Sequence, residues 1–123
     1  MDVNQQLLES NEMLTKSIVD IAGETFRFKR TFMRVISKME SQDQEKYISQ
    51  FNWFTKRVDK AVENAGLRIL DLTDQEYDPG MSVTALNIED FDPEDVLYVD
   101  QMIEPVIMKG DIIRKTGTVI LRR

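Results

Sequence analysis

The longest regular pattern in the chain is the apolar periodicity of residues 3–39, VNQQLLESNEMLTKSIVDIAGETFRFKRTFMRVISKM. Read at alternating steps of four and three, its positions form a seam over more than four heptads. The seam residues are Leu7, Asn11, Leu14, Ile18, Ile21, Thr25, Phe28, Phe32, Val35 and Met39. No proline interrupts the pattern, and only Gly23 weakens it, by about 1 kcal/mol relative to alanine. The periodicity predicts one long amphipathic helix.

Such a helix is too long to be covered by the rest of a 123-residue chain. About 37 residues at 1.5 Å per residue extend over roughly 55 Å. We therefore predict that the seam pairs with a second copy of the chain. The predicted dimerisation residues are Leu7, Asn11, Leu14, Ile18, Ile21, Phe28, Phe32 and Val35. Asn11 falls at position a of the heptad, where it can pair with Asn11 of the second copy, and this favours a parallel register of the two helices. Alternatively, Asn11 lies in a solvated N-terminal turn that makes no such pair.

A second helix is predicted after the polar break of residues 41–44, and it runs to about Ala65. Its apolar positions recur at steps of three and four: Tyr47, Ile48, Phe51, Phe54, Val58, Ala61, Val62 and Ala65. Gly66 follows as a C-terminal cap. Because the first helix widens its apolar stripe at Met33 and Ile36, we predict that two helical hairpins form a four-helix bundle. Trp53 departs from the apolar face, either as a flank of the bundle core or as an exposed partner anchor.

After Gly66 the pattern changes to short β-rich runs at residues 67–72, 83–89, 96–108 and 111–121. Turn residues separate them at 78–80 and 92–95, and Lys109-Gly110 is a predicted hairpin turn. Pro105 predicts an edge position or a bend. The fold class is therefore α+β: a helical stalk and dimerisation bundle at residues 1–66, then a small β domain at 67–123.

The composition excludes several kinds of chemistry, since the chain contains neither cysteine nor histidine. Disulfides, the usual zinc, haem and iron–sulfur ligand sets, and Ser-His or Cys-His nucleophiles cannot be assembled. The one dense carboxylate cluster, residues 89–95, lacks the glycine and spaced oxygen ligands of a calcium loop. We predict a solvated acidic loop there, no catalytic residue, no metal site and no cofactor. We therefore predict a non-enzymatic protein, with carboxylate or lysine chemistry as the open alternative.

The charge distribution restricts the partners of the second half of the chain. Residues 66–123 carry twelve acidic and six basic side chains, and residues 71–100 carry ten acids and no base. Such a surface repels a nucleic-acid backbone, so we expect no nucleic-acid binding. No apolar run approaches the roughly 18 residues that span a bilayer. The polar start MDVNQQLLESNE lacks a signal-peptide core, and a cytoplasmic location follows by default.

The first helix also carries a basic group formed by Arg27, Lys29, Arg30, Arg34 and Lys38. Arg27, Arg30 and Arg34 share one face of the helix, away from the seam. This face is either a solvated flank or an electrostatic contact for an acidic partner surface, where it would raise the association rate and fix orientation.

The order of a long helix, a bundle helix and a compact β domain resembles the GrpE family, and three motifs carry the resemblance. Ala65-Gly66-Leu67-Arg68-Ile69-Leu70 is similar to the family's "fGv-x-xi" junction. Asp78-Pro79, followed by Thr84-Ala85-Leu86, is similar to its D-P turn. Asp111-Ile112-Ile113-Arg114 with Gly117-Thr118-Val119-Ile120 resembles its "R-x-[I/L]-R…x-V-x-V" terminal hairpin.

The resemblance implies a nucleotide exchange factor, a cochaperone that binds the ATPase domain of an Hsp70-like protein and promotes ADP release. The implied partner-binding residues are Arg30, Arg34, Met102, Glu104, Met108, Asp111 and Arg114. The chain departs from the family pattern where Asp111 replaces an arginine and where residues 103–106 replace a Q-K-G-Y segment. The alternative is therefore a coiled-coil dimeric adaptor or scaffold of GrpE-like fold that has lost exchange activity.

Overall fold

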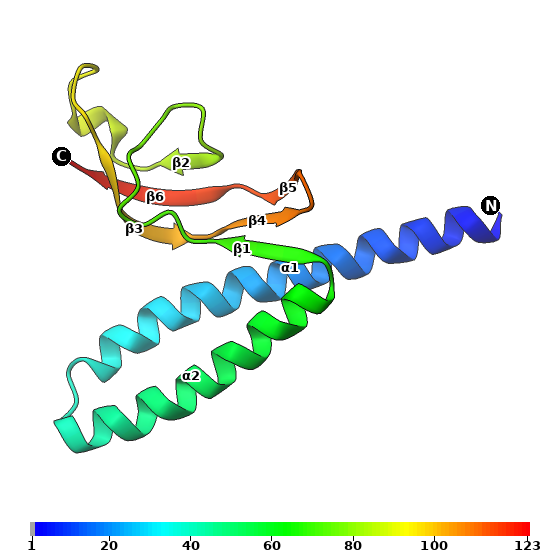
Figure 1. Ribbon diagram of the computed structural model, residues 1–123, viewed down its shortest axis with the longest axis horizontal. Helices are drawn as coiled ribbons and strands as arrows, with labels where there is room; N and C mark the ends of the chain where they lie inside the picture. Colours follow the sequence, from blue (N-terminus) through cyan, green and yellow to red (C-terminus); the bar gives the residue numbers. More distant parts are fainter. Residues whose placement is uncertain (1) are drawn as a thin grey trace. The chain divides into compact units, whose positions relative to one another are not determined.

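The computed structural model describes residues 2–123, which divide into two compact units, one up to Leu67 and one from Arg68 to Arg123. The first unit holds two long helices, α1 (Val3–Ile36) and α2 (Ser41–Asn64). Short strands in two small sheets make up the second (Figure 1). The chain is therefore an α+β protein, with its helices before its sheets.

Helix α1 begins at a side-chain cap and ends earlier than its sequence pattern predicts. The Asp2 carboxylate accepts a hydrogen bond from the Gln5 N–H at 2.7 Å, which satisfies one of the free donors of the first turn. The helix ends at Ile36 and not at Met39, because the last turn closes on Ser37, whose hydroxyl donates to the Arg34 carbonyl at 2.6 Å. The prediction of a helix up to Met39 was three residues too long.

Helix α2 includes the polar residues that were predicted to precede it. It starts at Ser41, and the Gln44 side chain donates to the Met39 carbonyl at 2.7 Å, which ties the first turn of α2 to the connection from α1. Gly66 lies just beyond the other end with φ +79°, the left-handed conformation of a helix C-terminus. The predicted glycine cap is confirmed.

An aromatic cluster holds the antiparallel α1–α2 hairpin together. The ring centroid of Phe51, a buried residue, lies 4.8 Å from that of Phe32 and 6.0 Å from that of Phe28. Ile36 and Val62 are also buried in this unit. Burial of a phenylalanine side chain contributes about 2–3 kcal/mol, so the packing of Phe51 against α1 stabilises the fold of α2 back on α1.

The β unit is a bent ribbon with two added strands. Strands β3 (Tyr98–Glu104) and β4 (Val106–Lys109) are separated by Pro105; β5 (Ile112–Lys115) and β6 (Gly117–Arg122) are separated by Thr116. Since β3 pairs with β6 and β4 with β5, both antiparallel, the four strands form one hairpin that bends at Pro105. Strand β1 (Leu67–Leu70) pairs beside β4, and β2 (Val83–Ala85) pairs parallel to β6.

The core of the β unit lies along this ribbon, with Val99, Ile107 and Val119 fully buried. The sequence pattern predicted a strand over residues 83–89, but β2 ends at Ala85 and a short 3₁₀ helix, η1 (Ile88–Asp90), follows. The reason is Asn87, whose side chain takes the place of backbone in pairing with β6. At the predicted turn, the Asp78 carboxylate accepts from the Gly80 N–H at 2.9 Å.

Candidate functional site

Half of the predicted seam is uncovered in the single chain. Leu7, Leu14, Ile21, Phe28 and Val35 recur at every seventh residue of α1, and each retains between 48% and 62% of its exposure. We call these five residues the heptad stripe. A strict seven-residue apolar repeat is typical of a helix that supercoils with another helix, because it keeps one line of side chains facing the partner.

Three other seam residues are partly covered. Ile18, Thr25 and Phe32 are half-buried, and Phe32 contacts the buried Phe51 of α2. Of the predicted dimerisation residues, Ile18 and Phe32 are therefore partly buried within the chain, whereas those of the heptad stripe are exposed. Asn11, beside the stripe, is exposed.

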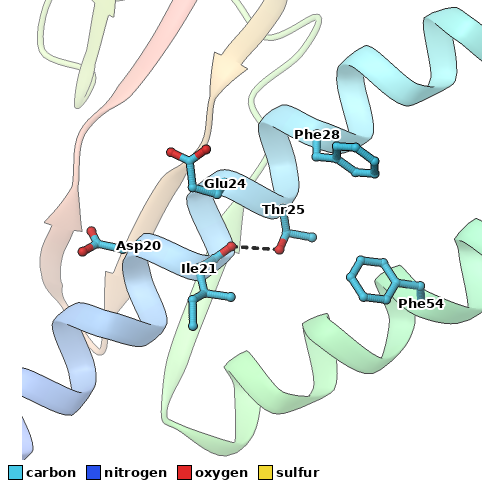
Figure 2. A pocket seen from close by; sticks show the side chains of 6 residues that line it. All are labelled: Asp20, Ile21, Glu24, Thr25, Phe28 and Phe54. Atoms are coloured by element: carbon cyan, nitrogen blue, oxygen red, sulfur yellow. Dashed lines mark hydrogen bonds between the residues drawn. The ribbon is translucent and has the colours of Figure 1, made fainter.

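A shallow groove of about 400 Å³ lies where the stripe meets α2 (Figure 2). Its apolar lining comes from Ile21, Phe28 and Phe54, with Thr25 between them. The Thr25 hydroxyl donates to the Ile21 carbonyl at 2.8 Å, so the polar atom is already satisfied within the helix. In Figure 2 the rings of Phe28 and Phe54 project into the space between the two helices. The groove thus offers apolar area on both of its walls.

The carboxylates of Asp20 and Glu24 form the outer edge of this groove. Figure 2 shows them pointing away from α2, on the far side of Ile21. Glu24 makes only an exposed ion pair with Arg27 at 3.5 Å, which contributes little to stability. The groove is therefore apolar inside and acidic along its α1 edge.

The edge of α2 beyond Phe54 carries basic and polar side chains. Trp53 is exposed and stacks against the Arg57 guanidinium, whose carbon lies 4.5 Å from the ring centroid. Ser49 and Gln50 complete a second shallow hollow of about 530 Å³ on this side of Phe54. Trp53 is exposed in the single chain, and both roles predicted for it, a flank of the bundle core and an exposed partner anchor, stay predictions.

The predicted basic contact face on α1 is partly available. Arg34 is exposed, whereas Arg30 is half-buried and already has an interaction partner within the chain. Arg27 is paired with Glu24. Of the three arginines that share this face, Arg34 is thus the best placed to meet an external acidic surface.

Two of the predicted partner-binding residues have structural roles in the β unit. Met102 is buried at 4% exposure, and its sulfur accepts the Leu72 N–H at 3.0 Å. Glu104 lies at the bend of the ribbon, where Oε2 accepts from Lys115 Nζ at 2.7 Å and Oε1 from the Thr118 hydroxyl at 3.4 Å. Met102 is corrected from a contact residue to a core residue because β3 turns its side chain inward.

The remaining predicted residues gather around the β4–β5 turn. Asp111 is exposed at the turn itself, and Met108 and Arg114 are half-buried on its two strands. Beside them Ile112 and Ile113 are 65% and 45% exposed. The sequence analysis did not select these isoleucines, although two adjacent apolar residues in a short edge strand must place one side chain on each face.

The acidic loop gathers no metal-binding set. Within residues 2–123 no three carboxylates come together in a way that could hold a cation. The loop is instead closed on itself and on the chain terminus: the Asp92 N–H donates to Asp95, and Arg123 pairs with the same carboxylate at 3.1 Å. Across the described residues, no helix is both long and apolar enough to traverse a bilayer.

Comparison with known proteins returned no match to this chain among protein families, curated proteins or solved structures. The geometry presents two exposed apolar areas: the heptad stripe with its groove on the helical unit, and the edge strand β5 on the β unit.

Proposed function

We propose that this chain is a GrpE-like nucleotide exchange factor, a non-enzymatic cochaperone that binds the ATPase domain of an Hsp70-like protein and promotes ADP release. The observation that carries the proposal is the combination of an uncovered heptad stripe on α1 with a separate β unit whose terminal hairpin presents exposed residues. This is the order of elements that the sequence resemblance implies. Both parts are surfaces suited to protein contact.

Exchange requires differential affinity and no covalent step. The factor must bind the open, nucleotide-free ATPase more tightly than the closed ADP form. A tenfold preference corresponds to about 1.4 kcal/mol, and by linkage ADP then binds the complex ten times more weakly. A handful of contacts at a protein surface can supply a difference of this size.

We propose that the ATPase contacts the terminal hairpin of the β unit and the basic face of α1. The residues at the β4–β5 turn are Met108, Asp111 and Arg114, Glu104 lies at the bend of the hairpin, and the helical residues are Arg30 and Arg34. Met102 is left out because it is buried. The contact combines exposed apolar area with charges of both signs, which favours a mixed protein surface as partner.

We further propose that the chain acts as a homodimer through the heptad stripe. Replacing Ile21 by glutamate puts a charge into the stripe at a site that is already 62% exposed, so the hairpin itself should fold. The expected result is a mass of one chain in light scattering, against two for the parent. Met13→Glu is the matched control, because Met13 is also largely exposed on α1, at 72%, but lies outside the stripe.

The exchange activity is tested by the release of a fluorescent ADP analogue from Hsp70-like ATPases of the same source. Addition of the chain should accelerate release at least tenfold with its cognate ATPase, and excess ADP should weaken binding in a pull-down. If no such ATPase releases nucleotide faster, the exchange proposal is wrong.

A second candidate is a dimeric adaptor or scaffold without exchange activity. The observation in its favour is Asp111, an exposed acid at the turn where the family pattern has an arginine. An adaptor should bind its partner with the same affinity whether or not ADP is present. Nucleotide-dependent pull-downs therefore separate the two functions.

A further inference from the structure

The outer edge of β5 is open and apolar, whereas the edge of β3 is covered by the chain itself. The sheet of β1, β4 and β5 ends at β5, which pairs with β4 on its other side. Ile112 and Ile113 are 65% and 45% exposed there. In the other sheet, the Val99 N–H donates to the Gln75 carbonyl at 2.9 Å, and the Val99 carbonyl accepts from the Asp74 N–H at 2.8 Å. Among the described residues no such segment lies along β5.

The register of the β4–β5 hairpin shows which backbone groups of β5 face the open edge. The turn has two residues, and the first of them, Gly110, has φ +59°, as in a type II′ hairpin. The strand residues that flank such a turn, here Lys109 and Ile112, hydrogen-bond to each other through their backbones. Bonded and non-bonded pairs alternate along an antiparallel ladder, so the next pair, Met108 and Ile113, is non-bonded. The N–H and C=O of Ile113 therefore point away from β4.

The sheet that ends at β5 is basic, although the second half of the chain is acidic. Residues 66–123 carry six basic side chains, and four of them lie on β1, β4 and β5: Arg68, Lys109, Arg114 and Lys115. None of the twelve acidic residues in this half of the chain lies on these three strands. Lys115 is paired with Glu104 at the bend, and Arg114 already interacts within the chain. The sheet keeps a positive charge in excess of these contacts.

Each face of the open edge combines an isoleucine with a basic side chain. Cross-strand partners in a ladder lie on the same face, so Ile112 shares its face with Lys109. Ile113 shares the opposite face with Met108, whose sulfur lies 3.7 Å from the exposed Arg68 guanidinium. A strand added beside β5 would meet apolar area and positive charge on both of its faces.

Bulges and basic side chains also protect edge strands against unwanted pairing. In β5 these devices lie in its second half, because the ladder shifts register between Ile107 and Met108 and leaves Arg114 as the extra residue. Ile112 and Ile113 precede the shift and remain open. A second copy of the chain is disfavoured at this edge, since pairing β5 with β5 brings the basic side chains of both copies together. The charge instead favours an acidic partner.

We propose that β5 is a strand-addition site for an extended acidic segment of a partner protein. The segment pairs with the outward N–H and C=O of Ile113, and its β-branched side chains cover Ile112 and Ile113. Main-chain hydrogen bonds hold such a segment, and the side chains beside it set which segment binds. The inference goes beyond the proposed function, because an exchange factor and an adaptor could both use this edge.

The test is the binding of a synthetic peptide to the full chain, measured by fluorescence anisotropy. The probe has valine and threonine at its centre and glutamate at both ends. We expect saturable binding that weakens as salt is added, because exposed charges are screened. A peptide with lysine in place of glutamate should bind at least about tenfold more weakly. A third peptide keeps every side chain of the probe but is N-methylated throughout its centre, so it lacks the amide donors on both edges and should lose at least about tenfold as well.

Variants of the chain locate the site. Ile113→Pro removes the outward N–H without removing a ladder bond, so the denaturation midpoint should stay near that of the parent while peptide affinity falls at least about tenfold. Ile113→Val keeps the N–H and the β-branched shape, and should bind within about threefold of the parent. Lys109→Glu should weaken binding of the glutamate peptide about threefold. Lys60→Glu, the same change at an exposed position of α2, should leave it unchanged.

Each outcome decides a stated point. Equal binding of the N-methylated peptide overturns strand addition, and equal binding of the lysine peptide overturns the choice of an acidic partner. No binding of the glutamate peptide at a chain concentration of about 1 mM overturns the site. If Ile113→Pro fails to fold, the assignment of its outward N–H is wrong, and the modified peptides on the parent chain then decide the proposal. ADP release is measured separately, so a failure of exchange activity leaves the peptide result intact, and the reverse also holds.

Discussion

The side chain of Asn87 pairs with the backbone of Leu121 as a neighbouring strand would. Its Nδ2 donates to the Leu121 carbonyl at 2.9 Å, and its Oδ1 accepts from the Leu121 N–H at 2.8 Å. The two residues are 34 positions apart, so one amide group fixes the segment after β2 to the last strand. An aspartate has the same shape but only the acceptor, and it turns an anionic oxygen toward the Leu121 carbonyl.

We expect Asn87→Asp to destabilise the β unit by about 1–2 kcal/mol, the cost of one lost hydrogen bond and a desolvated carboxylate. Hydrogen exchange at the Leu121 amide measures this directly, and protection there should fall first. Gln75→Glu, at an exposed position of the same unit, adds the same charge and serves as control. Equal protection in both variants would show that the Asn87 pairing contributes nothing.

A second prediction concerns Gly117, where β6 crosses the bend of the ribbon. A Cβ at this position would lie 3.0 Å from Met102 Cε, 3.0 Å from Val106 Cγ2 and 3.1 Å from the Glu104 carbonyl oxygen. The methionine end can move, but the carbonyl belongs to a paired strand. Gly117→Ala should therefore cost about 1–3 kcal/mol in the free energy of unfolding.

The matched control for this substitution is Gly80→Ala. There a Cβ meets its nearest atom, Asp78 Oδ1, at an ordinary distance of 3.5 Å. Denaturant unfolding of both variants should show a clear loss for Gly117→Ala and a change below about 0.5 kcal/mol for Gly80→Ala. Equal costs at the two positions would mean that β6 can shift away from the bend.

The aromatic cluster yields a third prediction, for the helical unit. Phe51 is buried and contacts Phe28, Phe32 and Phe54, whereas Phe54 is 45% exposed. Phe51→Ala should lower the stability of the hairpin by about 3–4 kcal/mol. Phe54→Ala should cost about 1 kcal/mol at low protein concentration, because half of its surface already faces solvent. Loss of helical circular dichroism on denaturation is the readout.

These two phenylalanines respond differently if the homodimer forms. Because Phe54 lines the groove that the second copy would cover, its replacement should weaken association more than it weakens the hairpin. The cost of Phe54→Ala should then grow as protein concentration rises, while the cost of Phe51→Ala should change little. A concentration-independent cost at both sites would argue against burial of Phe54 between copies.

Gly66 provides a fourth prediction, on the end of α2. Its φ of +79° is unfavourable for any residue with a Cβ, although no atom lies within 4 Å of where that Cβ would be. Gly66→Ala should therefore cost about 1 kcal/mol from backbone strain alone. Gly66→Asn should cost less, since asparagine tolerates the left-handed region better. Similar costs for the two variants in thermal unfolding would contradict this origin.

The sequence predicts the helices well because the helical signal is local. Each apolar position of α1 and α2 recurs within four residues, and Gly66 stands next to the end that it caps. The early end of β2 could not be predicted, since it depends on Asn87 reaching Leu121 across 34 residues. The early end of α1 depends on a hydroxyl contact of Ser37 that no periodicity records.

The candidate site was predicted in part for the same reason. The heptad repeat gave the seam, but only the fold of α2 over Phe32 shows which half of it stays uncovered. In the β unit the register shifts between Met102 and Glu104 decide which side chains face inward. Alternation alone therefore could not assign Met102 to the core or reveal how exposed Ile112 is.

The last prediction tests the proposed ATPase contact at Ile112. This side chain is 65% exposed on the edge strand β5, so Ile112→Ser should change the free energy of unfolding by less than about 0.5 kcal/mol. If the β4–β5 turn meets the ATPase, the same substitution removes apolar contact area there and should weaken binding about tenfold, about 1.4 kcal/mol. Leu86→Ser is the control, because Leu86 is 62% exposed in the same unit but follows β2. With this chain at a sub-saturating concentration, the rate of ADP release should fall for Ile112→Ser and stay unchanged for Leu86→Ser. The reverse pattern would show that the ATPase contacts the loop after β2 and not the terminal hairpin.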